Sequence, residues 1–128
     1  MPDADNAAEV VRRFCAAWSD SDLDAIIDFF TDDAVYHNIP VAPVTGRDAI
    51  RTTIAGFTGN VESVEFRVLN MAANGNVVLT ERVDVFQFPG KSLELPVMGT
   101  FEVTGDGRIS AWRDYFDLNQ FMSQLPTA

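Results

Sequence analysis

Three charged side chains occur among large apolar residues in two segments that alternate with a period of two. Arg82 and Asp84 share parity with two phenylalanines in the segment 77–88, and Asp114 stands between a tryptophan and a phenylalanine in the segment 108–117. Because strand side chains alternate between faces, all three fall on the apolar face. Buried charges are costly unless they pair, and the planar fork of an arginine can bond two carboxylates at once. The spacing therefore predicts an Asp-Arg-Asp bridge across neighbouring strands.

Such a bridge has a definite protonation state. Two carboxylates and one guanidinium carry a net negative charge when all are ionised, and none when they share one proton. Burial favours the neutral state, so we expect either Asp84 or Asp114 to hold a proton near neutral pH. One cavity then contains a general acid and a general base. The alternative left open by the spacing is a buried salt bridge that only fixes the register of the sheet.

An extended segment over 33–39 adds two further polar side chains. Tyr36 and Asn38 share one face of this strand, whereas His37 points to the other. A Tyr-x-Asn pair is by itself typical of a hydrogen-bonded strand, so its importance depends on sharing a cavity with the three charged residues. We interpret His37 as a surface or interface residue and Asp117 as a helix cap.

The elements that position these residues follow from a change in periodicity. Helical spacing of apolar residues predicts three helices, over about 6–19, 21–30 and 46–57, the second capped by Ser21 and Asp22. From about residue 61 the period is two, which predicts four strands, over about 61–72, 77–88, 92–104 and 108–117. Hairpin-type turns separate these strands, so we expect them to pair antiparallel in sequence order. A short final helix follows Asp117.

Helices at the front and long antiparallel strands behind predict an α+β fold, with a curved sheet wrapped around the helices. We expect one domain over residues 1–128, because the sequence contains no linker, internal repeat or low-complexity segment. Side chains on the concave face of such a sheet point into a conical cavity.

The composition excludes several partners. The formal net charge is −10 and the nine Lys and Arg residues are scattered singly, so we expect no nucleic acid and no anionic membrane as partner. The first residues lack the features of a secretory signal, and no apolar run approaches the ~20 residues that cross a bilayer. We therefore expect a cytoplasmic protein. The single Cys15 cannot form an intramolecular disulfide and falls on an apolar helical stripe.

Together these motifs resemble the limonene-1,2-epoxide hydrolase family. The resemblance covers nearly the whole chain and rests on Tyr36-x-Asn38, Arg82-x-Asp84 and Trp112-Arg113-Asp114-Tyr115-Phe116-Asp117. That family is similar in fold to nuclear transport factor 2 and ketosteroid isomerase. The resemblance thus implies a cone-shaped, curved mixed β-sheet wrapped around three to four helices, a cystatin-like arrangement.

The resemblance also implies roles for the polar residues. Asp114 would take a proton from a water molecule held by Tyr36 and Asn38, Asp84 would protonate the epoxide oxygen, and Arg82 would bridge the two carboxylates. The expected reaction is a one-step hydrolysis to a vicinal trans-diol, with no cofactor, no metal and no covalent intermediate. The expected assembly is a homodimer.

The walls of the predicted cavity are apolar. Strand parity and the final helix assign Phe86, Leu95, Val97, Trp112, Phe116 and Phe121 to the substrate. This set suits a hydrophobic epoxide, limonene-like or alicyclic.

Two other functions compete with this interpretation. A ketosteroid isomerase-like or polyketide cyclase-like enzyme needs an oxyanion donor opposite its base, for which an arginine held between two aspartates is a poor fit. A non-enzymatic domain for a hydrophobic ligand or a protein partner would not need polar side chains inside its cavity. A metal enzyme is disfavoured, because the only histidine, His37, faces away from the carboxylates.

Overall fold

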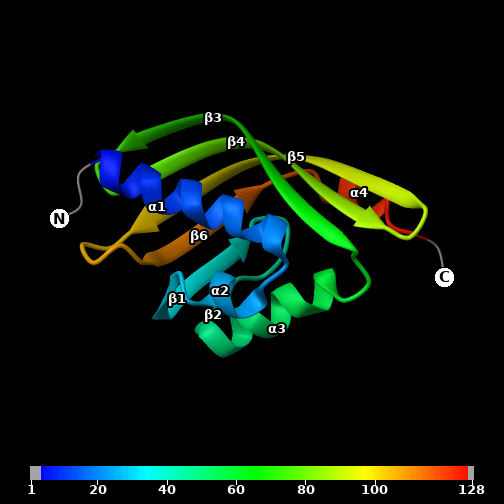
Figure 1. Cartoon of the computed structure of the whole chain (residues 1–128), viewed down its shortest axis with the longest axis horizontal. Helices are drawn as coiled ribbons and strands as arrows, with labels where there is room; N and C mark the ends of the chain where they lie inside the picture. The colour runs from blue at the N-terminus through cyan, green and yellow to red at the C-terminus, as the bar shows by residue number, and fades with distance from the viewer. Residues whose placement is uncertain (1–3, 127–128) are drawn as a thin grey trace.

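The structure, a computed structural model, describes residues 4–126 and contains a six-stranded sheet with α1 lying across its concave side (Figure 1). The strand order is β2-β1-β6-β5-β4-β3. The strands are β1 (Phe30–Asn38), β2 (Val44–Thr45), β3 (Ser63–Asn74), β4 (Val77–Phe88), β5 (Lys91–Val103) and β6 (Ile109–Tyr115). The helices are α1 (Ala4–Ala17), α2 (Leu23–Ile27), α3 (Arg47–Thr58) and α4 (Leu118–Met122), and a 3₁₀ turn, η1 (Trp18–Asp20), follows α1. The predicted α+β class is confirmed.

The long strands β3 to β6 pair antiparallel in sequence order, as the turns between them predict. In two of these turns Gly75 and Gly90 have φ values of 61° and 73°, which glycine adopts without steric cost. β1 lies on the other side of β6 and runs parallel to it, with β2 at the outer edge. This parallel pair makes the sheet mixed and brings the polar side chains of β1 next to the last strand.

The core lies between α1 and the concave face of the sheet, where α1 contacts β3, β4 and β5. The buried face of α1 contains Val10, Val11 and Phe14, each at most 1% exposed, at the spacing of an amphipathic helix. The ring of Phe14 meets that of Trp112 edge-on, with centroids 5.0 Å apart. The helix is thus packed directly against the strand that carries Asp114.

The second helix is shorter than its sequence pattern predicts. α2 ends at Ile27, and Phe30, which we expected within the helix, begins β1. Phe30 is fully buried and pairs with Ile109 of β6, so a strand satisfies its hydrophobic contacts as well as a helix would. The strand therefore begins before the predicted Asp33. A register shift follows Phe30 along β1.

Two helix caps occur where the sequence predicts them. The side chain of Asp22 accepts a hydrogen bond from the backbone N–H of Ala25 at 3.2 Å, and that of Asp117 accepts one from Gln120 at 3.0 Å. The strand β2 was not predicted, because its two residues are too few to carry a periodicity.

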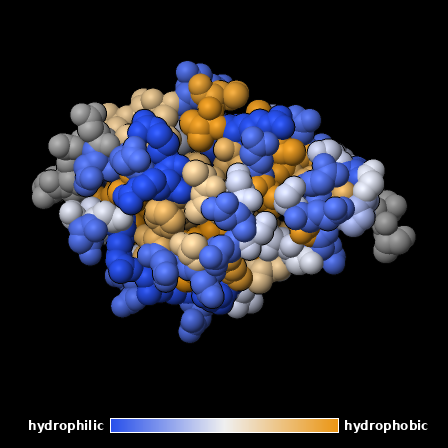
Figure 2. Space-filling view, in the orientation of Figure 1, coloured by the Kyte–Doolittle hydropathy of each residue, from blue (hydrophilic) through white to orange (hydrophobic). Residues whose placement is uncertain are grey.

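Hydrophilic side chains cover most of the face seen in Figure 1, and hydrophobic ones gather between them near the centre of that view (Figure 2). On the outward face of the sheet, Met98 of β5 and Tyr115 of β6 are paired neighbours and are 49% and 48% exposed. Within residues 4–126, no helix combines the length and the apolar character needed to cross a membrane.

Candidate active site

Arg82 and Asp84 of β4 and Asp114 of β6 point into the protein, as strand alternation predicts. Their exposed fractions are 1%, 4% and 4%. On β4 they alternate with Val83 and Val85, which are only partly buried on the outward face. The three charged residues therefore lie on the apolar concave face, where each depends on the others to compensate for lost hydration.

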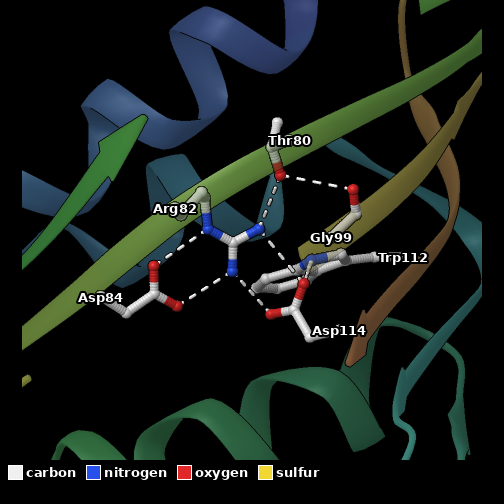
Figure 3. A network of polar contacts seen from close by, with 6 residues as sticks. All are labelled: Thr80, Arg82, Asp84, Gly99, Trp112 and Asp114. Carbon is white, nitrogen blue, oxygen red and sulfur yellow. Dashed lines mark hydrogen bonds and ion pairs between the residues drawn. The ribbon is translucent and has the colours of Figure 1, made fainter. Parts of the chain in front are cut away.

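The guanidinium of Arg82 binds both carboxylates at once (Figure 3). Its Nε and Nη2 donate to Oδ1 and Oδ2 of Asp84, each at 2.9 Å. Its Nη1 and Nη2 donate to Oδ1 and Oδ2 of Asp114 at 3.2 and 2.8 Å. Nη1 also donates to Oγ1 of Thr80 at 3.1 Å. The five N–H groups of Arg82 thus have acceptors, which compensates for burying the charge.

The two carboxylates come from strands that are not neighbours. Because β5 runs between β4 and β6, the prediction of a bridge across neighbouring strands was wrong. Gly99 of β5 pairs with Thr80 on one side and with Asp114 on the other. A Cβ at this glycine would lie 2.6 Å from Oδ1 of Asp114 and closer still to Nη1 of Arg82. The missing side chain therefore leaves the space through which Arg82 reaches across β5.

Trp112 has a different place from the one predicted for it. It is fully buried and is not a wall of the cavity. Its Nε1 donates to Oδ1 of Asp114 at 2.7 Å, and its ring stacks on that of Tyr36 with centroids 4.2 Å apart. Strand parity assigns a side chain to a face but not to a depth, so it could not distinguish a wall from a residue behind the wall.

Tyr36 and Asn38 lie on β1, beside the last strand. The parallel register pairs Tyr36 with Trp112 and Asn38 with Asp114. Both polar residues line the cavity that Asp84 and Asp114 also line. Tyr36 and Asn38 therefore share a cavity with Asp84 and Asp114, which is the condition on which their importance depended.

The electrostatics of the site follow from burial and from the Arg82 bridge. Burial raises the pKa of Asp84 to about 6, although Arg82 acts in the opposite direction. Burial alone would lower the pKa of Arg82, but the carboxylates of Asp114 and Asp84 outweigh it and raise that pKa above its ordinary value. Burial, followed by the charge of Asp114, raises the pKa of Tyr36 as well. Arg82 therefore remains a cation and Tyr36 keeps its hydroxyl proton, whereas Asp84 titrates near neutral pH.

Tyr36, Asn38, Asp84 and Asp114 line an otherwise apolar cavity of about 270 Å³. Five of the six predicted wall residues line it, namely Phe86, Leu95, Val97, Phe116 and Phe121. Sequence reasoning missed five further lining residues: Val41, Phe57, Phe66, Leu118 and Met122. Most of these come from helices and from the loop after β1. Strand alternation does not predict which residues of a helix or a loop approach the cavity.

Two other residues whose side chains could take part in catalysis, His37 and Cys15, lie outside this cavity. Nε2 of His37 is hydrogen-bonded with the backbone oxygen of Val41 at 3.0 Å, and His37 is not a lining residue. Burial raises the pKa of Cys15 to about 12, so it remains a thiol. Among the described residues 4–126, no group of three or more His, Cys, Asp or Glu side chains is placed to hold a metal ion. The candidate active site is therefore the cavity around the three charged residues.

Comparisons with known proteins cover almost the whole chain. Epoxide hydrolase EphG of Mycobacterium tuberculosis is 34% identical over 115 residues, which are 90% of this chain and 76% of EphG. The solved structure of an M. tuberculosis LEH-like epoxide hydrolase has a TM-score of 0.83 and 33% identity, covering 97% of this chain and 92% of that one. A protein with a ketosteroid isomerase-like fold from Catenulispora acidiphila has a TM-score of 0.80 and 25% identity, covering 92% of this chain and 94% of that one.

These likenesses agree with the fold described above. The six-stranded mixed sheet and its few helices form a ketosteroid isomerase-like fold, also called nuclear transport factor 2-like. Residues 5–127 match the family of the limonene-1,2-epoxide hydrolase catalytic domain. The chain therefore belongs to the limonene-1,2-epoxide hydrolase family, and it is an epoxide hydrolase of that family.

Proposed function

We propose that this protein adds water to a hydrophobic epoxide in one step, without a covalent enzyme intermediate, and that the product is a vicinal trans-diol. The observation that carries the proposal is the position of Arg82 between Asp84 and Asp114 at the cavity. Epoxide opening needs a base for the attacking water and an acid for the departing oxygen at the same time. A bridged pair of carboxylates supplies both, and no cofactor enters the reaction.

Asp84 is the acid and Asp114 the base in this proposal. Burial raises the pKa of Asp84 to about 6, which supports a protonated fraction near neutral pH. Asp114 accepts one hydrogen bond from Trp112 and two from Arg82, and donors of this kind favour a carboxylate. Because the proton belongs to the coupled pair, the assignment describes the state from which the reaction starts.

The proton transfers balance over one turnover. The water oxygen attacks a ring carbon while a water proton passes to Asp114. The ring C–O bond breaks, and the epoxide oxygen takes the proton of Asp84. The hydroxyl of Tyr36 and the amide of Asn38 hold the water, a role supported by their place in the cavity beside Asp114. Asp114 then releases its proton and Asp84 regains one. Attack opposite the breaking bond gives the trans product.

The substrate is a compact apolar epoxide, such as limonene oxide or cyclohexene oxide. Support comes from the cavity, whose lining beyond the polar groups consists of aromatic and aliphatic side chains. Its volume of about 270 Å³ is small for a ligand pocket. A cavity of this size suits an alicyclic ring better than a long-chain epoxide.

We further propose that residues 1–128 form one catalytic domain and that the protein is a homodimer. The exposed neighbours Met98 and Tyr115 on the outward face of the sheet support an interface there, because pairing two copies would remove apolar surface from water. Light scattering on the eluted protein should give the mass of two chains for the wild type and of one chain for Met98→Glu. A wild-type mass of one chain would contradict the dimer.

A single turnover in ¹⁸O-labelled water tests the reaction. With enzyme in excess over limonene oxide or cyclohexene oxide, direct attack by water should place one labelled oxygen in every diol. An ester intermediate would instead give an unlabelled diol in the first turnover, with the oxygen coming from a carboxylate. Asp114→Asn is the control, and it should form diol at least about 10²-fold more slowly. Absence of turnover by the wild type on both epoxides would contradict the proposed substrate class.

A further inference from the structure

Trp112 contacts the proposed base from behind the cavity. Its Nε1 donates to Oδ1 of Asp114 at 2.7 Å (Figure 3), yet the residue itself does not line the cavity. We propose that Trp112 is a positioning residue that fixes the orientation of the Asp114 carboxylate and directs the proton of the attacking water to Oδ2. The inference rests on the proposed function, because it takes Asp114 as the base.

The hydrogen bonds on Asp114 are divided unequally between its two oxygens. Oδ1 accepts from Nε1 of Trp112 at 2.7 Å and from Nη1 of Arg82 at 3.2 Å. Oδ2 accepts from Nη2 of Arg82 at 2.8 Å. A carboxylate oxygen offers about two lone-pair sites, so Oδ1 is filled while Oδ2 keeps a site for another proton. The geometry therefore selects the oxygen as well as the residue that acts as base.

The same donor separates the roles of the two carboxylates. Asp84 accepts two N–H groups from Arg82, one at each oxygen, and Asp114 accepts two from Arg82 and a third from Trp112. Every such donor stabilises the ionised form of a carboxyl group. The indole N–H thus shifts the shared proton toward Asp84. Without it, the two aspartates would be nearly equivalent partners of the arginine.

The indole is held firmly enough to direct one proton. Trp112 is fully buried, and its ring stacks on those of Tyr36 and Phe101, with centroids 4.2 and 5.6 Å away. Phe14 of α1 packs edge-on against it at 5.0 Å. Close packing of this kind leaves the side chain one orientation, so the Nε1–H points constantly at Asp114.

The second tryptophan offers a matched control from the same aromatic cluster. Trp18 is 2% exposed, and its ring stacks on that of Phe66 with centroids 4.4 Å apart. In contrast to Trp112, its buried Nε1 has no hydrogen-bond partner within the part of the chain that the structure describes. Replacing either tryptophan by phenylalanine costs similar packing, but only at Trp112 does it remove a hydrogen bond to a carboxylate.

The pH profile of turnover distinguishes positioning from packing. In Trp112→Phe we expect kcat to fall about tenfold, the effect of losing a hydrogen bond to a charged group, with KM changed by less than about twofold. The low-pH limb of the kcat profile should move to higher pH, because an aspartate that has lost a donor takes up a proton more readily. Trp18→Phe should leave that limb in place. A Trp112→Phe profile that superimposes on the wild type would overturn the proposal.

NMR with both tryptophans in place provides a second measurement, which applies even where Trp112→Phe does not fold. The two tryptophans of the chain give two indole N–H resonances. We expect one to lie downfield and to move in Asp114→Asn, while the other stays unchanged. If neither resonance moved, the proposal would be overturned. This measurement requires no turnover, so its failure is distinguishable from failure of the proposed function, for which the test is epoxide hydrolysis by the wild type.

Discussion

Gly99 lies against the guanidinium of Arg82, and its lack of a side chain lets the arginine cross β5 to reach the last strand. Thr80 completes the crossing, because its Oγ1 accepts from Nη1 of Arg82 at 3.1 Å and donates to the backbone oxygen of Gly99 at 3.3 Å (Figure 3). At the Arg82 bridge itself, β5 therefore takes part through its backbone, whereas its side chains Leu95 and Val97 line the cavity. The glycine in the interior of this strand is explained by the close approach of the Arg82 guanidinium.

Gly99→Ala should damage both the fold and the reaction. The new Cβ would lie 2.6 Å from Oδ1 of Asp114 and closer still to Nη1 of Arg82, so the bridge must move. We expect a loss of about 1–3 kcal/mol in the free energy of unfolding, as for other overpacked sites, together with loss of turnover. Gly56→Ala on α3 is the control: apart from its chain neighbours and the backbone of its own helix, no heavy atom lies within 4 Å of the new Cβ, and alanine favours a helix. Equal melting temperatures and turnover for Gly99→Ala and wild type would contradict this account.

Arg82→Ala should be strongly destabilising, because it leaves two buried carboxylates without their cation. Removing one partner of a buried ion pair typically costs about 3–5 kcal/mol, and urea denaturation should give a loss in this range. Arg113→Ala is the comparison, since its bond to Glu102 lies at the surface, with side chains 31% and 39% exposed, and should cost less than about 1 kcal/mol. Similar costs for the two variants would mean that Arg82 is hydrated in solution.

Much of this architecture follows from local sequence patterns. Alternation over 77–88 places Arg82 and Asp84 on the buried face, because a period of two leaves no other choice for a half-buried strand. The turns at Gly75 and Gly90 fix the antiparallel pairing, because a short hairpin turn can join only antiparallel strands. By contrast, Phe30 satisfies a helical stripe and a buried strand equally, and only its pairing with Ile109 decides between them.

The depth and order of the site are not local properties. Nothing next to Trp112 in sequence indicates that it lies behind the cavity, since its position depends on stacking against Tyr36 from another strand. The strand that separates Arg82 from Asp114 is likewise a matter of sheet order. One signal was available, however, because Gly99 interrupts a strand of otherwise larger residues and so indicates a close approach.

Asp114→Asn and Asp84→Asn should each abolish most turnover while retaining the fold. An amide in place of Asp114 cannot accept the proton of water, and one in place of Asp84 cannot donate a proton to the epoxide oxygen. Losing a general acid or base typically lowers the rate 10²–10⁴-fold, which single-turnover diol formation should reveal. Asp117→Asn should turn over normally, because asparagine also caps a helix. Wild-type rates in Asp114→Asn would exclude it as the base.

The pH dependence of stability follows from Asp84. Its pKa in the folded protein is raised by burial from 3.8 to about 6, so between these values the folded state binds more protons than the unfolded state. This group's contribution to stability is therefore fully present below about pH 4 and is lost as the pH rises through about 6.

Comparison of the wild type with Asp84→Asn isolates this effect. The free energy of unfolding of the wild type, relative to that of Asp84→Asn, should fall between pH 4 and pH 7, by an amount on the order of 2–3 kcal/mol. Other carboxyl groups titrate in both proteins and cancel in the difference. The kcat of the wild type should decline over the upper part of the same range, because an ionised Asp84 cannot protonate the epoxide oxygen. A stability difference that is flat, or that rises with pH, would mean that Asp84 is ionised throughout and is not the acid.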